Sequence, residues 1–183
     1  MRGSRTAAMI TVALLAAACG APQAAPGQPA PLSTADPIDL SAFVQAPCGL
    51  PGPDQVARFY LSAPGTLTRA GAAVSCAWGS ADPHVPRYEA AVDLRSGGMA
   101  ALTARRSAFS VFEPTSIHSY PAAHVDDAHP ARADRCVVDV GVASDTLLTV
   151  TVTTGGKSGS DDPCTDADQF AGAIVGFQGH RAP

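Results

Sequence analysis

The apolar residues of this chain alternate with polar ones most regularly in its second half. Residues 135–144, RCVVDVGVAS, and residues 145–156, DTLLTVTVTTGG, place an apolar side chain at nearly every second position. A period of two is typical of β-strands that bury one face. The turn residues Ala143 to Asp145 separate the two segments, so we expect them to form an antiparallel hairpin.

Four weaker strand patterns precede this hairpin. Three of them are short segments bounded by turn residues. In the fourth, Pro121 interrupts the pattern, which favours an edge strand or a turn because proline lacks the N–H group that a strand ladder uses. The four segments are residues 65–71, 72–80, 87–96 and 116–125.

Three further segments carry helix signals. The clearest is residues 161–179, where Asp162 is suited to cap the helix, Pro163 to be its first residue, and a glycine to end it. Residues 52–63 and 97–110 are shorter candidates. Strands in runs, with helices before and after them, predict an α+β fold in which two or three helices pack on an antiparallel sheet.

The start of the chain has the layout of an export signal. Arg2 and Arg5 precede an uncharged apolar run at residues 7–17, which is too short to span a membrane. Three alanines then lead to Cys19. This pattern resembles a bacterial lipobox, in which the cysteine thiol receives a diacylglyceryl group and the chain is cut before it.

The match to a lipobox has one departure. Leu15 stands four residues before the cysteine, whereas the commonest pattern has leucine three before it. The alternative is an ordinary signal that is cut near Ala18 and leaves a free thiol. We expect a signal peptide at residues 1–18 and lipidation of Cys19.

The remainder of the chain divides into a tether and a domain. Residues 19–38 are rich in Ala, Pro, Gly and Gln and have no hydrophobic period, which predicts a tether. Residues 39–183 are long enough for a single domain. Removal of residues 1–18, with Arg2 and Arg5, changes the formal net charge from -4 to -6. We therefore expect no nucleic-acid partner, and attachment to the extracytoplasmic face of the cell membrane through the N-terminal lipid alone.

Four cysteines remain once Cys19 is set apart, and an even number in an exported domain indicates two disulfides. Four cysteines allow three pairings. Cys48 and Cys76 are 28 positions apart, as are Cys136 and Cys164. Each of these pairs would join a predicted helix start to a predicted strand, so we favour this pairing over the other two. A zinc site made of the four thiolates is disfavoured, because the sequence has no C-x2-C pair and the compartment is oxidising.

Several short motifs, taken in order, resemble the actinobacterial lipoproteins grouped as domain of unknown function 3558. The resemblance covers about residues 40–178 in addition to the lipobox. It implies an anchored location, this architecture and the paired cysteines, and it brings no known activity or cofactor. The matching elements are Cys19, the Pro-rich tether, PCGL at 47–50, CAW at 76–78, YPA at 120–122, CVVDV at 136–140 and DPC at 162–164.

One polar cluster is a weak candidate for metal binding. The segment HSYPAAHVDDAH contains His118, His124, Asp126 and His129. Imidazole and carboxylate groups are ligands for zinc or copper. The spacing fits no pair on one helix face, and nearby prolines indicate a loop. We therefore interpret the segment as a solvated polar loop and expect no metal and no cofactor.

The sequence lacks the common signatures of a hydrolase. It contains no G-x-S-x-G elbow, and no His–Asp–Ser order stands out, so we expect no enzymatic activity. Trp78 follows Cys76 closely on a predicted strand, and we expect it to pack against a disulfide in the core.

Two functions of different classes fit these features. The first is an interaction domain that binds an envelope or secretion protein. The second is a carrier or sensor that holds a lipid or small ligand in an apolar pocket. A packed core would favour the first and a deep apolar cavity the second. We favour the first, because the sequence shows no binding constellation.

Overall fold

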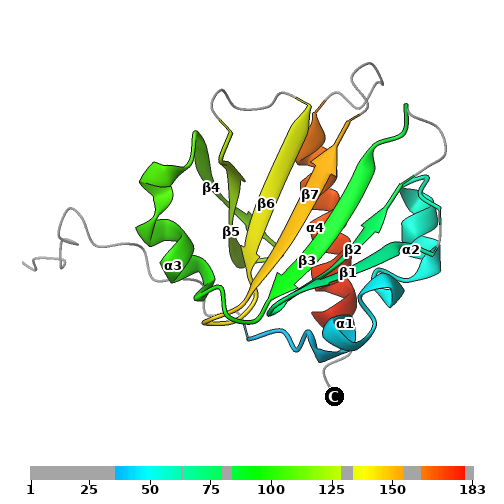
Figure 1. Ribbon diagram of the computed structural model, residues 1–183, viewed down its shortest axis with the longest axis horizontal. Helices are drawn as coiled ribbons and strands as arrows, with labels where there is room; N and C mark the ends of the chain where they lie inside the picture. The colour runs from blue at the N-terminus through cyan, green and yellow to red at the C-terminus, as the bar shows by residue number, and fades with distance from the viewer. Residues whose placement is uncertain (1–35, 63, 80–83, 129–133, 155–161, 180–183) are drawn as a thin grey trace, which may run out of the picture. The chain divides into compact units, whose positions relative to one another are not determined.

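The computed structural model describes residues 36–62, 64–79, 84–128, 134–154 and 162–179. The predicted signal peptide, Cys19, most of the predicted tether and His129 lie outside these residues. The described part forms a seven-stranded antiparallel sheet with helices on both faces (Figure 1). This confirms the predicted α+β class.

The elements follow one another in the order helices, strands, helix, strands, helix. The helices are α1 Ser41–Gln45, α2 Pro53–Arg58, α3 Gly98–Ala104 and α4 Pro163–Gly179, with 3-10 turns at Pro47–Gly49 and Arg106–Ala108. The strands are β1 Thr66–Ala70, β2 Ala73–Trp78, β3 Arg87–Asp93, β4 Val111–Ile117, β5 Tyr120–Asp126, β6 Arg135–Gly141 and β7 Leu147–Thr153.

The predicted hairpin lies in the middle of the sheet. The strand order is β1-β2-β3-β7-β6-β5-β4, and every neighbouring pair is antiparallel. Val150 of β7 lies opposite Val138 of β6 on one side and Ala90 of β3 on the other. The two strands with the most regular alternation thus lie at the centre of the sheet, away from both edges.

The segment around Pro121 differs from the prediction. In place of a single strand at 116–125, the chain forms two strands, β4 and β5, joined by a turn at His118 and Ser119. Both turn residues have positive φ angles, 47° and 72°, as two-residue hairpin turns require. Pro121 lies at the start of β5, before the residues that pair with β6, so its missing N–H group breaks no bond of that ladder. The edge strand of this pair is β4, which contains Pro114.

The first helices also differ from the prediction. Helix α1 was not predicted, because five residues are too few to show a helical period. Asp39 favours its start, since its carboxylate accepts a hydrogen bond of 2.8 Å from the backbone N–H of Ser41. The helix predicted at 52–63 ends at Arg58. Tyr60, which follows, has a φ angle of 57° that no α-helix contains.

The sheet buries both faces, unequally. Helix α4 covers the larger core, where Phe43, Trp78 and Phe170 are fully buried (Figure 1). Helix α3 covers a smaller cluster on the opposite face, which includes Leu102 and Val137. Neighbouring strand residues point to opposite faces, so Val137 packs under α3 while the residues on either side of it pack under α4.

Both favoured disulfides are confirmed. Cys48 is bonded to Cys76, and Cys136 to Cys164. Cys76 and Trp78 belong to the larger core, as expected for the tryptophan. Gly65 lies against both of them: a Cβ atom there would stand 2.3 Å from the Cys76 Sγ and 2.7 Å from the Trp78 Nε1. Only glycine leaves room for the indole beside this disulfide.

Asp139 is a buried carboxyl group on the α3 face of the sheet. It accepts a hydrogen bond from the Thr149 hydroxyl across β6 and β7. Burial raises the pKa of Asp139 above its ordinary value, and the Thr149 bond and the Arg105 charge oppose this shift. Between the ordinary pKa of aspartate and the raised pKa of Asp139, the native state binds more of this proton than the unfolded chain does. The free energy of unfolding therefore falls as the pH rises through this range.

We expect Asp139→Asn to remove this pH dependence, because the amide oxygen still accepts the Thr149 bond and carries no charge. As the pH rises above the ordinary aspartate pKa, the free energy of unfolding of the wild type should fall relative to that of the variant. Urea unfolding at several pH values measures this difference. A difference that stays constant with pH would contradict the expectation.

Candidate functional site

An open groove lies beside α4. It has a volume of about 1080 Å³. Its walls come from four parts of the chain: the end of α2, the segment leading into β3, the end of β4, and α4 itself. The lining includes Arg58, Tyr60, His84, His118 and Gln169. Tertiary packing therefore builds the groove from segments that are distant in sequence.

The floor of the groove is aromatic and rests on the core. Phe59 and Tyr88 line the groove, and both rings pack on the buried Phe170 ring at 4.9 Å between centroids. The Tyr88 hydroxyl interacts with the Asp166 carboxylate of α4. Burial, followed by the negative charge of Asp166, raises the pKa of Tyr88 above its ordinary value. The hydroxyl thus stays protonated and fixes the floor against α4.

Two residues on the walls have an unusual backbone conformation. Tyr60 and His118 have φ angles of 57° and 47°, in a region that non-glycine residues seldom adopt. The Tyr60 side chain is 83% exposed. The His118 ring lies against Gly172 and Gly176 of α4, and a Cβ atom on Gly172 would stand 3.2 Å from its Nε2 atom. Both angles have local causes: the β4–β5 turn requires that of His118, and Tyr60 ends α2 in a Schellman motif, with its N–H bonded to the Ala57 carbonyl oxygen.

A second polar site lies at the start of α4. Residues 164 and 168 are four apart on the helix, so Cys164 and Asp168 share one face. On the sheet below, His124 of β5 pairs with Val138 of β6. Cys136 lies two residues before Val138 and so faces the same side as His124. The register of β5 on β6 thus brings the histidine under the first turns of α4.

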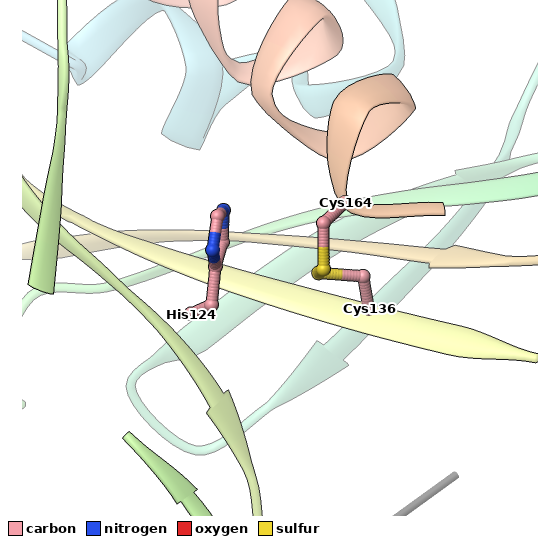
Figure 2. Close-up of side chains that lie close together, drawn as sticks. All are labelled: His124, Cys136 and Cys164. Carbon is pink, nitrogen blue, oxygen red and sulfur yellow. A yellow bond between two sulfur atoms is a disulfide. The ribbon is translucent and has the colours of Figure 1, made fainter. Parts of the chain in front are cut away.

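The side chains of this site are in close contact (Figure 2). The His124 Nε2 atom lies 2.8 Å from the Asp168 Oδ1 atom. A ring nitrogen of His124 and the sulfur atoms of Cys136 and Cys164 all lie within 4.8 Å of one another. Figure 2 shows the imidazole beside the disulfide, with Cys164 descending from the start of α4. We call these four side chains the His124 cluster.

Charged groups and a small hollow surround the His124 cluster. The hollow has a volume of about 260 Å³ and is lined by both cysteines, His124 and Glu113. Asp162 also lines it and caps α4, since its carboxylate accepts a bond of 2.9 Å from the Cys164 N–H. This confirms Asp162 as the helix cap predicted from the sequence.

The four weak metal candidates do not come together. His118 lies on the groove wall and His124 in the His124 cluster. Asp126 is buried, and its Oδ1 accepts a bond of 2.8 Å from the Ala128 N–H and lies 4.0 Å from the Arg135 guanidinium. His129 lies outside the described residues. The interpretation of this segment as a solvated loop is wrong for residues 120–126, which form β5.

Sequence reasoning missed the association of His124 with the second disulfide. One local signal was present, because the spacing of Cys164 and Asp168 places both on one side of the best-predicted helix. The pairing of β5 with β6 leaves no pattern in a single sequence. The single strand predicted at 116–125 was also wrong, so the position of His124 on β5 could not be inferred. In the part of the chain that the structure describes, no helix is long and apolar enough to cross a membrane.

These observations define a class: a disulfide-linked α+β domain with an open groove along one helix. The chain belongs to the family described as "Protein of unknown function (DUF3558)", whose model matches residues 14–176. Comparisons with curated proteins and with solved structures gave no match.

Proposed function

We propose that this chain is a lipid-anchored, extracytoplasmic binding domain that docks a protein of the cell envelope or of secretion in its α4 groove. The anchor is Cys19, after removal of residues 1–18. The single observation that supports docking is the groove itself, an open hollow of about 1080 Å³ that runs beside α4. Its volume lies at the upper end of the range of small-molecule sites, about 300–1,000 Å³, and the groove is open rather than enclosed.

The composition of the groove favours a protein partner. Tyr60 and Arg58 stand exposed on one wall, and tyrosine and arginine are enriched among the residues that dominate protein–protein binding energy. Tyr88, Asp166 and Asp168 already bond within the domain. The groove thus presents a preformed surface, with Arg58 as a cation on its rim.

The alternative, a carrier for an acyl chain, has less support. Such a carrier needs a deep apolar cavity. The core between α4 and the sheet is instead filled by side chains, with Phe43, Phe170 and Ile174 fully buried. The groove that does exist is open and lined by several polar side chains.

We expect Arg58→Ala and Tyr60→Ala each to reduce partner binding about thirtyfold or more, because truncation of a hot-spot residue costs at least about 2 kcal/mol. Both side chains are exposed, so stability should change by no more than about 0.5 kcal/mol. A photo-crosslinking residue at position 60 in living cells identifies the partner. Its affinity for each variant then gives the effect.

Leu67 on the edge strand β1 provides the control, because it is 49% exposed and does not line the groove. A crosslinker at 67 should give no adduct with the same partner. Equal adducts from both positions would contradict docking in the groove. An adduct with a lipid at position 60 would favour the carrier.

A further inference from the structure

We propose that opening the Cys136–Cys164 disulfide creates a binding site for a thiophilic divalent metal of the zinc class. The ligands are the two thiolates and a ring nitrogen of His124, and Asp168 positions the imidazole. This inference concerns the His124 cluster alone and does not depend on the proposed docking function.

The His124 ring lies close enough to both sulfur atoms for the three side chains to share one metal ion. In a tetrahedral zinc site with Zn–S of about 2.3 Å and Zn–N of about 2.0–2.1 Å, ligand atoms stand about 3.5–3.8 Å apart. The His124 nitrogen and both sulfur atoms lie within 4.8 Å of one another. When the Cys136–Cys164 bond opens, the two sulfur atoms are free to separate and to bind one metal ion together with the imidazole.

Hydrogen bonding prepares the histidine for this role. Asp168 holds the His124 ring through the 2.8 Å contact at Nε2, so the nitrogen left to bind a metal ion is Nδ1. Metal-bound histidines commonly pair with a carboxylate in this way, and loss of that carboxylate typically lowers metal affinity 10–100-fold. The His124 side chain is 16% exposed, so the ring is largely fixed before a metal arrives.

The surrounding charges favour a cation once the thiolates form. Glu113, Asp126 and Asp162 line the adjoining hollow, and Arg135 is the cation there that opposes them. Cys164 is the second residue of α4, where the helix dipole stabilises a thiolate. Two thiolates and three carboxylates thus face one guanidinium.

The other disulfide provides an internal contrast. Cys48 and Cys76 have the same sequence separation of 28. Cys76 is fully buried beside Trp78 and Gly65 in an apolar environment. Among the residues that the structure describes, the group of His124, Cys136 and Cys164 is the one that places three metal-ligating side chains together.

The chemical step is a two-electron reduction. A dithiol reductant gives two electrons and two protons to the Cys136–Cys164 bond and itself becomes a disulfide. Each cysteine is then a thiol. Metal binding releases the two thiol protons to solvent, so the site has two thiolate ligands and one neutral imidazole.

The test uses the full chain with Cys19→Ala, so that no thiol outside the two disulfides takes part. After reduction and anaerobic removal of the dithiol, Co²⁺ is titrated as the probe and thiolate-to-cobalt absorption is recorded, with circular dichroism to follow folding. Mass spectrometry after alkylation identifies the cysteines that were reduced. We expect one Co²⁺ per chain, displaced by Zn²⁺, and none for the oxidised protein.

Variants separate a built site from unspecific thiol binding. His124→Ala should weaken Co²⁺ binding at least tenfold and Asp168→Asn about tenfold, while Cys48→Ser/Cys76→Ser should bind like the parent. Unchanged affinity in His124→Ala would overturn the proposal. So would a reduced, folded chain that binds no Co²⁺, or a chain that unfolds as soon as Cys136–Cys164 opens.

Discussion

Phe170→Ala is expected to lower the free energy of unfolding by about 3–5 kcal/mol, the usual cost of truncating a fully buried phenylalanine. Phe170 is 0% exposed and lies midway along α4. Its ring contacts Phe59, Trp78 and Tyr88 at centroid distances of 4.9, 5.5 and 4.9 Å. Alanine leaves a cavity at the meeting point of α2, β2, β3 and α4. The three neighbouring rings are held from several directions, so they move only partly into this cavity.

Gln169→Ala is the matched control for this prediction. Gln169 precedes Phe170 on the same helix and is exposed, so its loss should change stability by no more than about 0.5 kcal/mol. Urea unfolding with both disulfides intact measures both variants. A loss under about 1 kcal/mol for Phe170→Ala would mean that this ring is not the centre of the larger core.

The Phe170 ring also supports the groove from below. Phe59 and Tyr88 form the groove floor and rest on the Phe170 ring. Without that ring, the floor loses its support while Arg58 and Tyr60 remain in the sequence. We therefore regard the groove as a property of the packed fold rather than of its exposed residues alone.

Features set by local spacing were predictable from the sequence. The alternation in β6 and β7 is regular because each strand buries one face fully under α4, at positions such as Val138 and Val150. The start of α4 was predictable because the Asp162 cap bonds within one turn. The disulfide pairing followed from equal spacings between a predicted helix start and a predicted strand.

Features that depend on strand register or tertiary packing were not predictable. The β4–β5 turn contains no glycine, because His118 and Ser119 adopt the positive φ angles themselves. The usual sequence signal of a hairpin turn was therefore missing. The contact of His124 with Asp168 joins residues 44 positions apart. It requires both the pairing of β5 with β6 and the seating of α4, and neither leaves a local pattern.

Cys19→Ala is expected to abolish both lipid attachment and membrane association. A single fatty acyl chain gives only marginal membrane binding, whereas two or three hold stably, because each buried methylene contributes about 0.8 kcal/mol. The chain has five cysteines, and four of them form the two disulfides. Cys19 is therefore the one thiol left to carry a thioether-linked lipid, and the substitution should remove the whole signal.

Metabolic labelling with a fatty-acid tracer, followed by separation of membranes from the soluble fraction, measures both effects. Gln23→Ala is the control, because it alters the predicted tether and leaves Cys19 in place; it should retain label and membrane association. If Cys19→Ala still carries lipid and sediments with membranes, attachment through this residue is wrong. If instead the wild type is cleaved but unlabelled and soluble, the signal is an ordinary secretory one. The domain would then meet its partner free in solution, and the predicted tether would have no anchoring role.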